Sequence, residues 1–381
     1  MDAEHHRNVV IGAGVVGSAA ARHLALRGEP VLLVEQFAPG HDRGSSHGLA
    51  RITRHSYADE YHARLMIEAF RGWRELEADA GCPFYLRTGG VSACPAAVDY
   101  VDQVSAALEA VGVPHRRMTG GEIRRALPMF APEDPTDAVF EPDAGLLASS
   151  RIVEAQLALA SAQGALFRPR CKVDRIDLEG ERPALVGDGF RIEADRLIVA
   201  AGAWAAGLLP SWRGKLRATR QQVLYLQGPI SGGTALGRLP VWIYVGTSEG
   251  QAYYGMPDFL GGGAKAARHS GPEVDPDHAP RGVDPGYVAE IRAFLRGFLP
   301  MLADAPMARS ETCLYTMSPD EMFLVGPLPD RPDVLLASAC SGHGFKFGDL
   351  VGRALADLAI DGRTDLPIGP WSPARSFGAC P

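Results

Sequence analysis

The chain has 381 residues, more than a single hydrophobic core usually serves, so we expect two domains. Apolar residues make up 46% of the sequence and charged residues 22%, which is ordinary for a water-soluble globular protein. The formal net charge is −7 and the positive residues are scattered, which argues against nucleic acid or an anionic membrane as a partner.

The sequence shows no targeting segment, membrane span or metal-binding cysteine pattern. Residues 1–7 include acids and no apolar core, so they do not resemble a signal peptide. No apolar run approaches the roughly 20 residues of a membrane span. The six cysteines form neither a C-x-x-C pair nor a Cys/His cluster with zinc spacing. We therefore expect a cytoplasmic protein with reduced thiols and no metal site.

A glycine-rich motif near the start of the chain predicts a βαβ unit that binds a dinucleotide. A buried strand is expected at 9–11, a helix at 18–27 and a second strand at 31–34 with an acid at its end. The first glycine of G-x-G-x-x-G permits a tight turn, the second lets the backbone approach a pyrophosphate, and the third lets helix and strand pack closely. The helix N-terminus suits phosphates, and the acid suits ribose hydroxyls. The motif fits NAD and FAD equally, and it assigns to the cofactor Gly12, Gly14, Val16, Gly17 and Glu35.

The rest of the chain alternates between helical and extended patterns. Amphipathic spacing predicts helices at 58–80, 99–111, 152–163, 287–298 and 349–360, and one more that opens at 119–120. Apolar, β-branched and aromatic runs predict strands at 84–86, 89–93, 138–141, 171–176, 190–192, 196–204, 223–226, 241–245, 252–255, 311–317 and 334–339. Residues 367–381 are expected to form a loose tail.

Two further segments are predicted to approach the cofactor. The loop at 37–48 contains Gly44-Ser45-Ser46-His47-Gly48, and its glycines and serines indicate backbone close to a ligand. The strand at 196–204 breaks into a small-residue turn at Gly202, which resembles the second dinucleotide-contacting turn of flavoproteins. From these segments we assign Ser45 and Gly202 to the cofactor site, together with Val173 of the strand predicted at 171–176.

Several motifs occur in order along nearly the whole chain. They are Gly12–Gly17, Gly44–Arg54, Tyr254–Pro257, Lys265, His269, Thr312–Thr316 and Ser341–Phe347. Together they resemble the family of monomeric sarcosine oxidase and N-methyltryptophan oxidase, which are FAD-dependent amine oxidases. The resemblance implies FAD as the cofactor, with a small-molecule amine and O2 as the substrates.

The resemblance also implies how the flavin is held. The family links its flavin covalently through the cysteine that matches Cys313, where a thiolate would form a thioether. From the local sequence alone, a small buried core residue is the competing interpretation. The turn Gly342-His343-Gly344 could direct its backbone N–H groups at the flavin ring, where their partial positive charge would stabilise the anionic reduced form. The residues that match flavin contacts are His47, Arg51, Gly342, Gly344, Phe345 and Lys346.

Other matching residues belong to the two substrates. Arg54 and Lys346 resemble a clamp for the substrate carboxylate, because an anion in a closed cleft needs paired positive charge. The alternative is that both are solvated surface charges. Lys265 matches the lysine that activates oxygen, and its alternative is an exposed lysine in a glycine loop. The resemblance places on the substrate side Tyr254, His269 and Tyr315. Arg51 could assist the clamp instead of the flavin.

The order of the segments suggests that both domains are discontinuous. We expect an α/β protein with a Rossmann-like FAD-binding domain formed by 1–84, 145–218 and 320–381. A mixed, largely antiparallel sheet would form the substrate domain from 85–144 and 219–319. The ligand site would then lie across the boundary between the two domains.

We therefore predict a monomeric FAD-dependent oxidase of secondary amino acids, such as N-methyl amino acids, that forms an imine and hydrogen peroxide. Residues 258–260 and 266–268 depart from the family pattern, so they leave the amine substituent unassigned. A cyclic imino acid or a glycated amino acid is an alternative substrate. Two alternatives differ in function: a dehydrogenase with another electron acceptor, and a flavin-binding protein without turnover.

Overall fold

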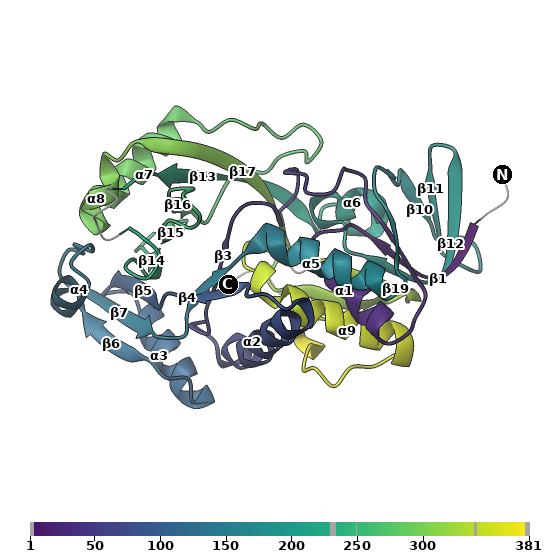
Figure 1. Ribbon diagram of the computed structural model, residues 1–381, viewed down its shortest axis with the longest axis horizontal. Helices are drawn as coiled ribbons and strands as arrows, with labels where there is room; N and C mark the ends of the chain where they lie inside the picture. The colour runs from purple at the N-terminus through teal and green to yellow at the C-terminus, as the bar shows by residue number, and fades with distance from the viewer. Residues whose placement is uncertain (1–3, 229–233, 249, 339–340, 378–381) are drawn as a thin grey trace.

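The computed structural model describes residues 4–228, 234–248, 250–338 and 341–377. It is an α/β structure in which segments far apart in the sequence lie together (Figure 1). The start of the chain, its middle and its C-terminal helix share one part of the molecule. A second part, at the left of Figure 1, carries a separate sheet with its own helices. This arrangement agrees with the predicted fold class.

The first sheet has the parallel centre expected of a dinucleotide-binding fold. β1 (Glu4–Ile11) lies between β2 (Val31–Val34) and β12 (Phe190–Val199) and pairs with both in parallel. The apolar half of β1 is fully buried, which explains why its sequence is β-branched. The remaining described strands of this sheet are β9 (Leu166–Arg168), β10 (Arg175–Asp177), β11 (Ala184–Gly187), β18 (Leu324–Leu328) and β19 (Arg331–Ser338).

Helices pack tightly against this sheet and against one another. α1 (Val15–Leu26) contacts both α5 (Ser149–Ala162) and α9 (Gly348–Asp361), and α2 (Glu60–Ala80) contacts α9. A Cβ placed on Gly352 of α9 would lie only 2.3 Å from the Cβ of Ala19, so glycine there allows the two helices to approach. This packing fixes the N-terminus of α1 at the carboxyl end of β1. A short helix, α6 (Ala205–Leu208), follows β12.

The second sheet is antiparallel except where β5 and β14 pair in parallel. Within the described residues its order is β17 (Met307–Met317), β13 (Arg217–Leu226), β16 (Ala264–Arg268), β15 (Ala252–Met256), β14 (Val241–Val245), β5 (Gly90–Pro95), β7 (Thr136–Glu141) and β6 (Arg116–Thr119). A small sheet between the two large ones contains β3 (Arg51–Thr53), β8 (Gly145–Leu147) and β4 (Tyr85–Arg87). The helices of this region are α3 (Tyr100–Val111), α4 (Gly120–Ala126), α7 (Pro285–Phe298) and α8 (Pro300–Ala303).

The alternation of side chains divides the second sheet into two unlike faces. One face is apolar and packs against α7; it includes Leu224, Trp242 and Ala266. The next residues along the strands, Tyr225 and Lys265, point to the opposite face and are direct cross-strand neighbours. The Tyr225 hydroxyl lies close to the loop before β3. The polar face is therefore directed toward the first sheet.

Three predicted strands are wrong in extent. The strand predicted at 171–176 begins only at Arg175, because the segment before it borders a cavity, although the Asp174 N–H still donates to the carbonyl oxygen of Val186 on β11 at 2.9 Å. The backbone N–H of Cys171 donates to the carbonyl oxygen of Glu35, at 2.8 Å. The separate strands predicted at 190–192 and 196–204 are one strand, β12, which ends at Val199. The last residue of the strand predicted at 334–339 lies outside the described part of the chain.

The predicted loose tail is also wrong for residues 367–377. A short helix, η4 (Gly369–Trp371), brings the Trp371 indole into the core, where its exposure is 0%. Arg375 forms an ion pair with Asp320. These contacts are tertiary, so no local sequence pattern predicted them. Residues 378–381 lie outside the described ranges. None of the described helices is both long and apolar enough to span a membrane.

Candidate active site

The glycine motif builds a cradle at the carboxyl end of β1. Gly12 has φ +97°, a conformation that favours glycine, and a Cβ there would lie 2.4 Å from the carbonyl oxygen of Ala200. A Cβ on Gly17 would lie 1.8 Å from the carbonyl oxygen of Gly12, so this glycine serves the packing of helix on strand. Gly14 precedes the first turn of α1 and directs backbone outward. The structure thus requires glycine at Gly12 and Gly17, whereas a Cβ on Gly14 would meet only the Ser46 side chain, 3.1 Å from its Oγ.

A cavity of about 370 Å³ opens beside this cradle. It runs from the end of β2 past the start of α1 to the turn before α9. Most residues predicted to hold the cofactor line it: Gly12, Gly14, Val16, Glu35, Ser45, His47, Val173, Gly202 and Phe345. Gly17 packs behind it. Arg51, Cys313, Gly342, Gly344 and Lys346 are not among the lining residues and belong to the region described below.

Glu35 is an ionised carboxylate at the wall of this cavity. Its oxygens accept from the backbone N–H groups of Ala13 and Phe37, at 2.8 and 2.9 Å, and the Nε2 of His41 lies 3.6 Å away. Burial alone would raise the pKa of Glu35, but these bonds together lower it. A buried carboxylate at the end of the second strand has the chemistry needed to accept bonds from ribose hydroxyls.

The cavity and its surroundings fit FAD. The glycine cradle would be filled by side chains at any other residue type, and the N-terminus of α1 faces the cavity. His47 presents a buried Nδ1 that has no hydrogen-bond partner among the described residues. The pKa of His47 is lowered to about 4 by burial and by Arg51, so the imidazole is neutral and can donate or accept.

Lys265 lies on the polar face of the second sheet, not in a glycine loop. It is 4% exposed in β16, with Tyr225 and Met256 as its cross-strand neighbours. Burial and the charge of Arg51 lower the pKa of Lys265 to about 7. Its Nζ lies 5.5 Å from the ring centre of Tyr254. The exposed-lysine interpretation is therefore wrong, and this ammonium faces the space between the two sheets.

Arg51 is held rigidly beside Lys265. Its guanidinium donates to the carbonyl oxygens of Ser45, His47 and Ala50, at 2.8, 2.7 and 3.0 Å. Its Cζ lies 5.8 Å from the ring centre of Phe345, which lines the cavity. Cys313 occupies β17 on the same side of the sheet, where its thiol influences the pKa values of both Lys265 and Arg51. The three groups are thus neighbours.

Tyr57 joins the two residues predicted to clamp a carboxylate. Lys346 Nζ donates to the Tyr57 hydroxyl and to the carbonyl oxygen of His343, both at 3.0 Å. Arg54 Cζ lies 4.7 Å from the centre of the Tyr57 ring, and its Nη1 is buried without a hydrogen-bond partner in the described structure. Burial and Arg54 hold the pKa of Lys346 well below its usual range. The interpretation of both cations as solvated surface charges is therefore wrong.

An aromatic cluster connects this clamp to Lys265. The Tyr315 hydroxyl lies 3.4 Å from the Tyr254 hydroxyl and 3.4 Å from His269 Nδ1. A Cβ on Gly342 would lie 2.3 Å from His269 Cε1, so the turn before α9 packs directly on this cluster. Burial, Lys346 and Arg54 lower the pKa of His269 to about 4. His269 is therefore neutral at physiological pH.

The turn that carries Lys346 is fixed from behind. Gly344 precedes η3 (Phe345–Phe347), and its carbonyl oxygen accepts from the Phe347 N–H at 3.0 Å. The Trp73 indole on α2 donates to the carbonyl oxygen of Lys346 at 2.9 Å. The backbone of the clamp lysine is therefore held by both local and tertiary bonds.

Sequence reasoning missed several residues of this region. Tyr57 and His343 contact Lys346 directly, and Tyr225 donates to Glu311 beside Lys265 at 2.8 Å. A tyrosine three residues after Arg54 was the one local signal. Tyr225 sits in an apolar strand, where alternation does not reveal which face meets a ligand.

Known proteins resemble this chain over nearly its whole length. The family described as FAD dependent oxidoreductase (DAO) matches residues 7–358. Monomeric sarcosine oxidase of Streptomyces avermitilis is 34% identical over 392 residues, covering 97% of this chain and 98% of that protein. N-methyl-L-tryptophan oxidase of Yersinia pestis is 30% identical over 375 residues, covering 96% and 98%. The open form of NikD, described as an unusual amino acid oxidase essential for nikkomycin biosynthesis, superposes with a TM-score of 0.85 at 23% identity, covering 99% of each chain.

The buried charge of Lys265 makes stability depend on pH. The pKa of its ammonium falls from 10.5 to about 7 on folding, so between these values the unfolded chain binds more protons and stability rises with pH. Lys265→Met removes this penalty. We expect the cofactor-free variant to gain about 1–4 kcal/mol in free energy of unfolding at pH 7, and the gain to shrink as the pH approaches the unfolded value.

Chemical denaturation at pH 7 and at a higher pH measures this gain. Lys172, which is exposed, supplies the control, and Lys172→Met should change stability little at either pH. A Lys265→Met protein that is no more stable than wild type at pH 7 would contradict the account.

Proposed function

Because the chain belongs to the FAD dependent oxidoreductase (DAO) family, we propose that it is a flavin-dependent amine oxidase of the sarcosine oxidase type, acting on secondary amino acids. The observation that carries this proposal is the pair Arg54 and Lys346, a half-buried arginine whose Nη1 is buried and a fully buried lysine, which meet at Tyr57. In the described part of the chain, neither forms an ion pair with an acidic side chain. A small ligand with a carboxylate supplies the missing charge.

The cavity beside the glycine cradle holds FAD in this proposal. Glu35 and the N-terminus of α1 bind its adenosine and pyrophosphate end. His47 and Phe345 also line the cavity, and Arg51 lies just outside its lining, with its Cζ 5.8 Å from the ring centre of Phe345. Bound FAD would supply the redox chemistry, a two-electron oxidation of the substrate C–N bond to an imine with reduction of O2 to hydrogen peroxide.

The protein's own groups favour the reactive form of the amine. His269 is neutral and lies near Arg54 and Lys346, whose positive charges oppose a third one close by. The same field lowers the pKa of a substrate ammonium, so the substrate loses its proton to solvent and binds as the neutral amine. The hydroxyl groups of Tyr254 and Tyr315 lie 3.4 Å apart beside His269 and can accept a hydrogen bond from the substrate amine. Substrate binding and amine deprotonation are thereby coupled.

Lys265 serves the oxygen side of the reaction in this proposal. Its side chain is buried beside Tyr254, with the Nζ 5.5 Å from the ring centre, whereas Lys346 of the carboxylate clamp contacts Tyr57. A fixed positive charge in a dry site stabilises the negative charge that develops on oxygen as it is reduced. Arg51 adds to that field and keeps the region positive when Lys265 loses its proton.

Several wider assignments rest on the same reasoning. The first and second sheets support the FAD-binding domain at 1–84, 145–218 and 320–381, and the substrate domain at 85–144 and 219–319. The site then lies where they meet, as ligand sites often do. We also propose that the enzyme is a cytoplasmic monomer, the state named for its sarcosine-oxidizing relative.

Peroxide release tests this function directly. The holoenzyme should produce hydrogen peroxide from one member of a panel of N-methyl, cyclic and glycated amino acids. Arg54→Met should raise the KM of that substrate about ten- to hundredfold, because one charged hydrogen-bond donor to the carboxylate is lost. The exposed Arg363→Met is the control and should leave the KM unchanged. Absence of peroxide with the whole panel, or equal effects of the two variants, would refute the proposal.

Covalent attachment of the flavin through Cys313 has its own test. Acid-precipitated wild-type protein should stay yellow, and Cys313→Ala should release the colour into the supernatant. Cys171→Ala is the control, because Cys171 lines the cavity and its backbone N–H binds the carbonyl oxygen of Glu35, whereas Cys313 lies on β17. The Cys171→Ala protein should keep its colour. Release of flavin from precipitated wild-type protein rules out the tether.

A further inference from the structure

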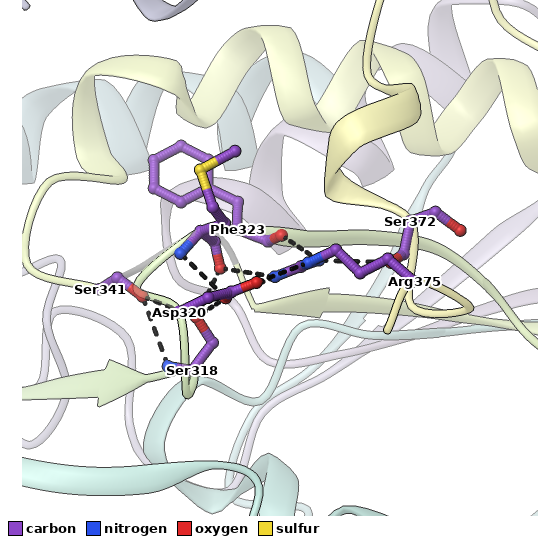
Figure 2. A network of polar contacts seen from close by, with 7 residues as sticks. Ser318, Asp320, Phe323, Ser341, Ser372 and Arg375 are labelled. Atoms are coloured by element: carbon purple, nitrogen blue, oxygen red, sulfur yellow. Dashed lines mark hydrogen bonds and ion pairs between the residues drawn. The ribbon is translucent and has the colours of Figure 1, made fainter. Parts of the chain in front are cut away.

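A bidentate ion pair lies behind the turn that carries Lys346. Arg375 Nε and Nη2 donate to the two carboxylate oxygens of Asp320, at 2.9 and 2.8 Å, as Figure 2 shows. Their side chains are only 15% and 21% exposed. Arg375 Nη1 also donates to the carbonyl oxygen of Phe323 at 2.8 Å. The guanidinium therefore uses all three of its nitrogens to grip the segment that follows β17.

The ion pair continues into a chain of hydrogen bonds that reaches the turn. The Ser318 hydroxyl donates to the carbonyl oxygen of Met322 at 2.6 Å and lies 3.2 Å from Asp320 Oδ1. Arg375 Nη2 donates to the same Met322 oxygen at 3.2 Å. Ser318 in turn meets Ser341, with 3.4 Å between the hydroxyl oxygens and 3.5 Å from the Ser318 N–H to the Ser341 hydroxyl (Figure 2). Both serines are 1% exposed. Polar groups this deeply buried need such partners, so the chain is a single unit.

Ser341 needs external support. Its φ is +35°, in the region that residues other than glycine adopt only at a cost in free energy. Its backbone N–H donates to the carbonyl oxygen of Thr316 at 2.8 Å, which ties it to the end of β17. The next residue, Gly342, packs against His269 and Tyr315. A shift of Ser341 therefore moves the turn within the aromatic cluster.

Phe323, whose carbonyl oxygen Arg375 binds, also supports His343 through ring contacts. The Phe323 ring lies 4.6 Å from the His343 ring and 4.8 Å from the Trp371 indole, measured between ring centres. Arg375 holds the carbonyl oxygen of Phe323, so it also sets the position of that ring. His343 in turn supplies the carbonyl oxygen that binds Lys346 Nζ.

We propose that Arg375 is a positioning residue for the substrate's carboxylate site: through Asp320, Ser318 and Phe323 it holds the turn that places Lys346 opposite Arg54. The inference rests on the proposed function, because it assumes that Lys346 binds the carboxylate. Burial favours protonation of Asp320, but Arg375 lowers its pKa, so the carboxylate stays ionised. Removing Arg375 leaves a buried charge that must find new partners or water.

The chain contains a matched control pair. Arg331 Nε and Nη2 donate to the two carboxylate oxygens of Asp333, at 3.0 and 2.7 Å. The side chains are 19% and 20% exposed, close to the values for Arg375 and Asp320. This pair lies at the start of β19, at the opposite end of the strand from the turn. Loss of either pair disturbs the same domain, but only one lies behind Lys346.

Acetate titrated into the holoenzyme and followed by flavin absorbance probes the carboxylate site without turnover. Arg375→Gln should weaken acetate binding about tenfold, because a small displacement of a binding group is costly. Arg375→Lys should recover part of the loss, and Arg331→Gln should stay within about twofold of wild type. In a Lys346→Met background, Arg375→Gln should cause no further weakening, since it acts through Lys346. If Arg375→Gln does not fold, Ser318→Ala cuts the same chain and carries the same expectation.

Two results would overturn the inference. One is equal acetate affinity in the Arg375→Gln and Arg331→Gln proteins. The other is an Arg375→Gln effect that persists undiminished in the Lys346→Met background, which would mark a general loss of structure. A third result has a different meaning: if Lys346→Met alone binds acetate as tightly as wild type, the carboxylate clamp of the proposed function fails, and the inference fails with it.

Discussion

Positive charge buried without a matching carboxylate is the constraint around which this site is built. Lys265 and Lys346 are 4% and 7% exposed, and in the described structure neither forms an ion pair with an acidic side chain. Taking an ammonium out of water is costly, and the lowered pKa values of both lysines express that cost. Packing in the rest of the fold offsets this cost, and the proposed function brings a negative charge to each lysine. In the proposed function, a substrate carboxylate supplies this charge at Lys346, and the charge that develops on oxygen supplies it at Lys265.

The two lysines come from different parts of the fold. The apolar face of the antiparallel sheet packs on α7, which leaves the other face free to carry Lys265 and Tyr254 toward the cofactor domain. Lys346 comes from the opposite side, on the turn before α9. The Lys265 Nζ lies 5.5 Å from the ring centre of Tyr254, whereas the Lys346 Nζ contacts Tyr57, so the two lysines have different neighbours. The glycine cradle at Gly12 supplies the fixed frame on which both sides converge.

Local patterns predicted the cradle well, because its chemistry is carried by backbone conformation. The positive φ of Gly12 and the contact that forces Gly17 to lack a side chain follow from the motif itself. Resemblance to a family, not periodicity, singled out Lys265, since Gly261–Gly263 made the segment look like a loop. Its strand is formed by pairing with β13 and β15, which are distant in sequence. Trp371 and Arg375 were missed for the same reason, because tertiary contacts alone give the C-terminal segment its order.

Rapid-reaction kinetics of the two half-reactions test the division of labour between the two lysines most directly. Reduction by substrate is measured without oxygen, and reoxidation of the reduced enzyme is measured with oxygen, for Lys265→Met and Lys346→Met. The account predicts that Lys265→Met slows reoxidation about a hundredfold and leaves the rate of reduction nearly unchanged. Lys346→Met should do the reverse, weakening substrate binding and reduction. Comparable slowing of both half-reactions in either variant would contradict the account.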